Sequence, residues 1–342
     1  MFSKPPRLIL APMQRITDYP FLSVISHFGG PDAFVTEYFR VHCHSNLEPY
    51  ILRSIDENPT GRPIYAQMIG QDIPELVRSA KELIKHPVKG VDLNLGCPAP
   101  IVCRKDAGGG LLRNLAKVDQ ILGALRDAIP SPYEFTVKTR VGYTHESEFE
   151  ALLEIFAKHE IDSLAIHGRT VLERYQTPVH CDEVKLAVET LSCPVYANGN
   201  VVDVQTGLAY LKESSAAGLM VGRGAIRNPW IFSQLRAAFM GESHQKPRYR
   251  DLLEYIELLW SHTATAHQGG FDPTKHVQKM KRYMNYITQG IDEEFEYKVR
   301  RAKTQEDFFK ICEFYLNSSE EIPALPPEKS KLFCGFSDLL SK

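Results

Sequence analysis

The stretch Asp92-Leu93-Asn94-Leu95-Gly96-Cys97-Pro98 presents a cysteine directly after an apolar, strand-like run, and the glycine-rich segment 107–112 follows it. A cysteine in this position would lie at the carboxyl end of a strand, where barrel enzymes keep their reactive groups. A turn-forming Asn and a buried structural Cys would give the same local pattern. The rest of the chain decides between these two interpretations.

This run is one of eight short apolar or β-branched runs that alternate with stretches of helical periodicity. The alternation predicts parallel strands joined by helices. A count of eight favours an α/β fold closed into a (β/α)8 TIM barrel over an open, doubly wound sheet. Polar residues follow the runs, so polar groups would converge on one rim. The predicted strands are Leu8–Ala11, Ala33–Glu37, Ile64–Met68, Val91–Asn94, Phe135–Thr139, Ser163–Ile166, Val195–Ala197 and Gly218–Val221.

The 342 residues, 43% of them hydrophobic, are enough for a barrel and a second, smaller domain. We therefore predict a barrel domain over residues 1–240. Beyond the polar linker 241–248 only helical periodicity remains, which predicts a small all-helical domain over 245–320. The proline-containing segment 321–342 is expected to be a loosely ordered tail.

Composition narrows the class of protein further. Seven scattered cysteines without a close CxxC pair fit reduced thiols better than a disulfide framework or a metal site. Neither a signal peptide nor an apolar run of about 20 residues is present, so we expect a cytoplasmic protein without a membrane segment. A net charge of -2 provides no global attraction to nucleic acid, so such a partner would need a local basic patch. No obligate protein partner is evident.

Two glycine-containing loops follow the last two predicted strands, at 197–200 and 221–225. Their small residues would let backbone N–H groups approach an anion, and Arg223 adds a guanidinium group. Barrels commonly bind phosphate between these two loops. Each loop alone is equally compatible with a tight turn, but two on consecutive strands favour a phosphate site.

Three further strand-end residues suit a flat aromatic cofactor. Lys138 could place a cation near an electron-rich ring, Gln67 offers a donor and an acceptor, and His167 can donate a ring N–H. A solvent-exposed lysine and a structurally satisfied histidine are the alternatives for each residue taken alone. Because these residues share a rim with a phosphate site, we interpret the set as a flavin site. No GxGxxG dinucleotide fingerprint accompanies it, which favours FMN.

With these residues in place, the chain resembles the tRNA-dihydrouridine synthases, flavin enzymes that reduce uridine in tRNA. The motifs occur in the family's order and are followed by a helical region, as in the family. Two positions depart from the pattern, since the family usually has an acidic residue at Asn200 and often a bulkier one at Gly110. The matching motifs are Leu10–Met13, Gln67–Gly70, Asp92–Pro98, Val137–Arg140, His167–Thr170, Ala197–Gly199 and Gly222–Gly224.

The resemblance implies a noncovalent FMN reduced by NADPH, with hydride passing from flavin N5 to uracil C6. It implies that Cys97 protonates C5, which agrees with the ability of a thiol to act as a general acid. Asn94 would orient the uracil, and Arg140 would contact the substrate, although its role and that of Arg169 are not separable from sequence. The implied cofactor-binding residues are Pro12, Met13, Gln67, Lys138, His167, Arg169, Asn198, Gly199, Asn200, Gly222 and Arg223.

The target base must leave its stack to reach a flavin at a barrel mouth, so flanking protein must hold the tRNA. Lys279 and Arg282 share a helix face and could bind phosphates, although a solvated helix face is the alternative. Arg104 and Lys105 lie close to Cys97 in sequence and could reach a phosphate near the flipped base.

Two other functions deserve comparison. A flavin barrel resembling the dihydroorotate dehydrogenases would act on a free pyrimidine, but a small substrate does not explain a basic helical domain. An RNA-binding module without chemistry is disfavoured because Asn94, Cys97, Lys138 and His167 occur together. We therefore expect a tRNA-dihydrouridine synthase.

Overall fold

The sheet closes into a barrel. The computed structural model describes residues 5–175, 177–264, 271–332 and 340. In it, β2 pairs with both β1 and β4, and the remaining strands complete the circle, all of them parallel. The predicted TIM barrel is confirmed, and the open sheet is excluded. The strands are β1 (Arg7–Leu10), β2 (Ala33–Val35), β3 (Phe39–Arg40), β4 (Ile64–Ile69), β5 (Gly90–Leu95), β6 (Glu134–Arg140), β7 (Ser163–His167), β8 (Val195–Asn198) and β9 (Gly218–Val221).

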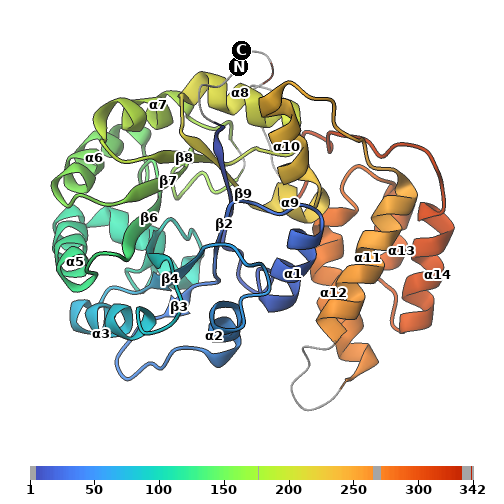
Figure 1. Ribbon diagram of the computed structural model, residues 1–342, viewed down its shortest axis with the longest axis horizontal. Helices are drawn as coiled ribbons and strands as arrows, with labels where there is room; N and C mark the ends of the chain where they lie inside the picture. The colour runs from blue at the N-terminus through green and yellow to red at the C-terminus, as the bar shows by residue number, and fades with distance from the viewer. Residues whose placement is uncertain (1–4, 176, 265–270, 333–339, 341–342) are drawn as a thin grey trace.

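Helices surround the sheet (Figure 1). Strands β4 and β5 are buried along their whole length, as expected for a parallel sheet covered by helices. Aspartates set several helix starts: Asp18, Asp72 and Asp203 each accept a hydrogen bond from a backbone N–H three residues on. The helices of this part are α1 (Tyr19–His27), α2 (Pro49–Asp56), α3 (Ile73–Leu83), α4 (Pro100–Cys103), α5 (Leu115–Ala128), α6 (Phe149–Lys158), α7 (Cys181–Thr190), α8 (Val204–Ser214), α9 (Arg223–Arg227) and α10 (Ile231–Met240), with short 3-10 helices η1 (Gly108–Arg113) and η2 (Glu146–Glu148).

The second predicted strand differs from the structure. The sequence predicts one strand over Ala33–Glu37, but β2 ends at Val35 and β3 forms separately beside β4. The Thr36 hydroxyl donates to the Glu37 carbonyl at 2.8 Å, which closes the bend between β2 and β3. Glu37 therefore lies in a bend at the barrel mouth and not in a strand.

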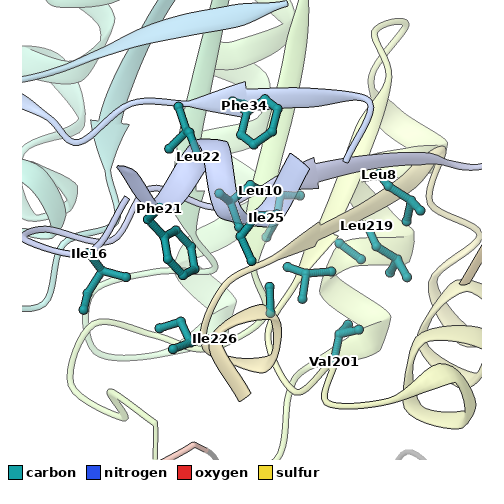
Figure 2. Close-up of a cluster of buried hydrophobic side chains, with 14 of the residues drawn as sticks. Leu8, Leu10, Ile16, Phe21, Leu22, Ile25, Phe34, Val201, Leu219 and Ile226 are labelled. Atoms are coloured by element: carbon teal, nitrogen blue, oxygen red, sulfur yellow. The ribbon is translucent and has the colours of Figure 1, made fainter. Parts of the chain in front are cut away.

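In the part of the chain that the structure describes, four helices form the second region, beside the barrel: α11 (Tyr249–Ala264), α12 (Pro273–Ile287), α13 (Glu293–Val299) and α14 (Gln305–Leu316) (Figure 1). Here α11 packs on α1 and α12 packs on α9. The apolar core next to this contact includes Phe21, Leu22 and Ile25 of α1, which cluster with Leu10 and Ile226 (Figure 2). The core continues without interruption into the helical region, which holds α12 in a defined place beside the barrel mouth.

The start of the expected loose tail is attached to the barrel. The buried Arg227 guanidinium donates to the carbonyls of Pro323 at 2.6 Å and Ala324 at 2.9 Å, and also to Gln289 in the helical region at 2.7 Å. Leu332 is fully buried against Val202. Over residues 321–332 the prediction of a loose tail is therefore corrected, because the prolines leave carbonyl groups free for a buried cation. Residues 333–339 and 341–342 lie outside the described residues. No helix in the described part has the length and apolar character needed to cross a membrane.

Candidate active site

A cavity of about 490 Å³ lies at the carboxyl ends of the barrel strands. Its volume falls within the roughly 300–1,000 Å³ typical of small-ligand sites. The structure brings together in its lining most of the residues predicted from sequence. They are Pro12, Met13, Asn94, Cys97, Lys138, Arg140, His167, Asn198, Gly199, Gly222 and Arg223.

A chain of buried hydrogen bonds positions the cysteine turn. Asn94 accepts from the backbone N–H groups of Gly96 at 3.0 Å and Cys97 at 2.9 Å through its Oδ1. Its Nδ2 donates to Gln67 Oε1 at 2.8 Å, and Gln67 Nε2 donates to Asp92 at 2.7 Å. An ionised carboxylate can only accept, and a backbone N–H can only donate, so the two ends fix both amide orientations. This series of hydrogen bonds holds Cys97 at the cavity.

Gln67 consequently occupies a different place from the one predicted. Its side chain is fully buried behind Asn94 and does not line the cavity. Asp92 at the end of the chain is itself buried, and this burial raises the pKa of its carboxyl group to about 6, against the lowering effect of its bonds to Gln67 and Thr136. Asp92 is a positioning residue that the sequence analysis did not single out.

The glycine-rich segment supports the same turn. A side chain at Gly109 would place its Cβ 2.9 Å from the Cys97 carbonyl oxygen, and one at Gly110 would come within 2.7 Å of the Cys103 oxygen. The Cys103 thiol donates to the Cys97 carbonyl at 3.4 Å. A bulkier residue at Gly110 would therefore force α4 to shift, which explains the glycine at this departure from the family pattern.

Lys138 and His167 lie at neighbouring strand ends and share a cationic environment. Lys138 donates to Asn198 Oδ1 at 2.9 Å, and burial, followed by the charge of Arg140, lowers its pKa to about 8. Burial and four nearby cations hold the pKa of His167 well below its usual value, so the imidazole is neutral at pH 7. Its Nδ1 is buried without a hydrogen-bond partner in the described residues.

Arg140 ties the cysteine turn to the loop after β7. Its guanidinium group is buried and donates to the Gly96 carbonyl at 2.9 Å, to that of Thr170 at 2.7 Å and to that of Arg174 at 2.9 Å. A guanidinium group carries five N–H donors. In Arg140, Nε donates to the Gly96 carbonyl and Nη1 donates to the other two. Arg140 lines the cavity as predicted, but its observed contacts make it a positioning residue.

Tyr175 lies at the side of the cavity where Arg223 does. Its ring lies 3.9 Å from the Arg223 guanidinium carbon, 5.3 Å from that of Arg140 and 5.8 Å from the His167 ring. Arg223 also donates to the Lys331 carbonyl at 3.3 Å, so the C-terminal segment reaches the same corner. Gly199 has a φ of +114°, which favours glycine, and a Cβ at Gly222 would meet nothing closer than 3.4 Å. Gly199 is buried and Gly222 is half-buried, and both line the cavity.

Two predicted cofactor residues, Arg169 and Asn200, lie beneath the cavity and do not line it. Arg169 donates to the Thr177 carbonyl at 2.6 Å and to Asn200 Oδ1 at 2.8 Å, and neither side chain is exposed. Asn200 takes a left-handed φ of 55°, which Asn tolerates better than most residues. An acidic residue at this position would accept from Arg169 in the same way, which accounts for the other departure from the family pattern.

The predicted RNA contacts are separate from the main cavity. Arg104 and Lys105 are exposed directly after α4. Lys279 and Arg282 of α12 line a second cavity, where Lys279 pairs with Asp18 at 2.9 Å. These two basic side chains of α12 thus lie beside the barrel mouth.

Several lining residues escaped the sequence analysis because loop folding alone brings them to the cavity. Tyr38 lies beside Cys97, and burial, with a smaller contribution from that thiol, raises its pKa. An aromatic residue directly after a strand-end acid was the one available signal for it. Others of this kind include Gln14, Arg174 and Tyr175.

The chain matches the family model described as dihydrouridine synthase over residues 9–319. A tRNA-dihydrouridine synthase B of Pseudomonas putida is 32% identical over 76% of this chain and 76% of its own length. A tRNA-dihydrouridine(16) synthase of Neisseria meningitidis is 27% identical over 84% of this chain and 87% of its own length. One of Cupriavidus necator is 29% identical, over 82% and 88% respectively.

Solved structures share the fold at low identity. A 2-naphthoyl-CoA reductase has a TM-score of 0.55 at 12% identity and matches 69% of this chain and 50% of its own. A morphinone reductase has a TM-score of 0.51 at 10% identity, over 68% and 87% respectively. These likenesses support the barrel architecture alone.

Proposed function

Because the chain belongs to the dihydrouridine synthase family, we propose that it reduces a uridine in tRNA to 5,6-dihydrouridine, with FMN as cofactor and NADPH as reductant. The observation that carries the proposal is the presentation of Cys97, beside Asn94 and Lys138, in one cavity at the barrel mouth. A thiol, an amide and an ammonium group together can protonate, orient and stabilise negative charge on a pyrimidine and a flavin.

The residues at the cavity fit a flavin mononucleotide. His167 Nδ1 is buried without a partner in the described residues and is available to a polar ligand atom. Lys138 would hold the electron-rich part of the ring, and Arg223, with the backbone of Gly199 and Gly222 in the cavity lining, would hold the single phosphate. When bound, the flavin supplies the hydride that reaches C6 of the uracil.

The chain's own groups supply the rest of the chemistry. The Cys97 thiol gives its proton to C5 of the uracil, and the bonds from Asn94 to the turn keep the thiol at the cavity. The cations Lys138 and Arg140 stabilise the thiolate that remains, because they lie in the same low-dielectric site.

Incubation of the purified protein with NADPH and an unmodified tRNA transcript tests the proposal. We expect flavin in the purified protein and dihydrouridine at one position, and position 16, named for several relatives, is the first to examine. Free uracil and dihydroorotate serve as control substrates. Turnover of dihydroorotate with no product in tRNA would favour the small-molecule dehydrogenase instead.

Removal of the Arg223 side chain should release the cofactor. We expect Arg223→Ala to weaken FMN binding roughly 10- to 100-fold, because it removes a charge-assisted phosphate interaction of about 1.5–3 kcal/mol. The measurement is flavin fluorescence recovered on dilution of the holoprotein. Arg223→Lys keeps the charge and should weaken binding less. Equal retention in all three proteins would limit Arg223 to its contacts with Tyr175 and Lys331.

Charge reversal on α12 should weaken tRNA binding. We expect Arg282→Glu to lower tRNA affinity and to reduce the log–log salt slope by about 0.7–0.9 for each phosphate that the variant no longer neutralises. Lys279 is the poorer choice for this test, because its partner Asp18 also caps α1. Lys310→Glu, an exposed change on α14, is the matched control. An unchanged slope in Arg282→Glu would mean that the RNA phosphates are bound elsewhere.

A further inference from the structure

A second cavity of about 390 Å³ adjoins the barrel mouth. It lies between the segment after β1, the bend between β2 and β3, and α12, and Gln14 lines both this cavity and the main one. A ligand in the second cavity would therefore be an immediate neighbour of the substrate in the first.

Glu37 contributes a buried carboxylate to this cavity. The residue is 2% exposed, and neither carboxylate oxygen has a hydrogen-bond partner in the described residues. Burial raises its pKa to about 7, although the nearby amides of Arg15 and Ile16 and the Lys279 ammonium act in the opposite direction. The Gln14 side-chain oxygen is also buried without such a partner. Buried polar groups in native proteins are nearly always satisfied, so two acceptor groups here, the Glu37 carboxylate and the Gln14 amide oxygen, can accept from a ligand.

Cations surround the opening of this cavity. The Lys279 ammonium pairs with Asp18 at 2.9 Å, so part of its charge is already neutralised within the protein. The exposed Arg15, Arg40 and Arg282 also line the cavity, as does Tyr50. Arg15 has a φ of 64°, a conformation that costs energy for a residue other than glycine and that often occurs at functional sites. Arginine is well suited to phosphate because its planar group donates two parallel hydrogen bonds.

The cavity thus combines two inner acceptors with outer cations. A guanine base presents two adjacent donors, N1–H and the 2-amino group, that match the two oxygens of one carboxylate. Adenine and cytosine place one amino group next to an acceptor, and uracil has one N–H between two acceptors. Bases splayed from RNA loops are commonly recognised through this edge.

We propose that this cavity binds a guanosine of the tRNA close to the reduced uridine, with Glu37 accepting from the guanine and Arg15, Arg40 and Arg282 binding its flanking phosphates. This inference rests on the proposed function, since it requires tRNA as substrate. It gives the chain a base-reading group outside the main cavity.

The test compares tRNA transcripts in which single guanosines near the target are replaced by inosine, which retains N1–H and lacks the 2-amino group. The dissociation constant is measured by fluorescence anisotropy for wild type and Glu37→Gln. In wild type, one replacement should weaken binding about 10-fold, as expected for loss of a hydrogen bond to a charged group. In Glu37→Gln the same replacement should have little further effect.

Glu37→Asp withdraws the carboxylate by one methylene and should also lose the preference for guanosine over inosine. This second variant keeps the proposal testable if Glu37→Gln folds poorly. Glu57→Gln, an exposed carboxylate paired with Arg53, should retain it. NADPH-driven reduction of the flavin reports correct folding in every variant. A guanosine preference that persists in both Glu37 variants, or its absence in wild type, would overturn the proposal. Because the measurement is of binding, it is independent of dihydrouridine formation, which tests the proposed function.

Discussion

Cys97→Ala is expected to slow reoxidation of the reduced flavin by tRNA by about 10²–10⁴-fold, the usual contribution of a general acid. Reduction of the flavin by NADPH should continue at the wild-type rate, since among the described residues no hydrogen bond joins the Cys97 thiol to Lys138, His167 or Arg223. Stopped-flow absorbance of the flavin, recorded separately for the two half-reactions, measures both rates.

Cys103→Ser is the matched control for this experiment. Cys103 is buried and donates to the Cys97 carbonyl, and serine retains a donor of similar size. We expect both half-reactions to remain within a few-fold of wild type, which would separate loss of the proton donor from disturbance of the turn. If Cys97→Ala reoxidised on tRNA at the wild-type rate, the proton would come from another group, and Tyr38, which lies beside Cys97, is the first to test.

Arg140→Met is expected to produce the largest loss of stability. The substitution leaves the carbonyls of Gly96, Thr170 and Arg174 without the buried donor that now joins them. Hydrogen bonds to charged groups contribute about 1.5–3 kcal/mol each, so the free energy of unfolding should fall by at least about 3 kcal/mol. Urea denaturation measures this change, and tRNA reduction should fall with it because the cysteine turn loses its support.

Two further variants separate the effect of the place of Arg140 in the fold from the effect of its charge on stability. Arg140→Lys keeps the charge but cannot span all three carbonyls, so its stability should lie between wild type and Arg140→Met. Arg53→Met removes an exposed arginine paired with Glu57 and should cost less than about 1 kcal/mol. Equal stability of Arg140→Met and wild type would show that water replaces the guanidinium at these carbonyls.

The barrel was predictable because its signal is local and repeated. Each strand is a short apolar run with a polar residue at its end, and each such end is positioned at one rim by the parallel arrangement. For the same reason Cys97, Lys138, His167 and the two glycine loops could be expected to meet at that rim. The functional groups of these residues then narrowed the range of possible functions.

The direction and partners of individual side chains were not predictable in this way. Gln67 and Lys138 are both polar residues on strands, yet one is buried in a hydrogen-bond chain and the other lines the cavity. Which of these occurs depends on neighbours from other strands, such as Asp92 and Asn198. The prediction for the tail was wrong over 321–332 for a similar reason, since a buried Arg227 far away in sequence holds its carbonyl groups.

The sequence by itself therefore determined the barrel, the rim on which chemistry occurs and the residue types available there, because these follow from periodicity and strand ends. Only the tertiary structure decided that Arg140 joins two loops, that the Tyr175 ring packs on Arg223 and that Glu37 shares a cavity with arginines from three separate segments. These contacts link segments far apart in the chain, and burial gives them their strength, since a charge or amide removed from water depends on the few partners that the fold supplies.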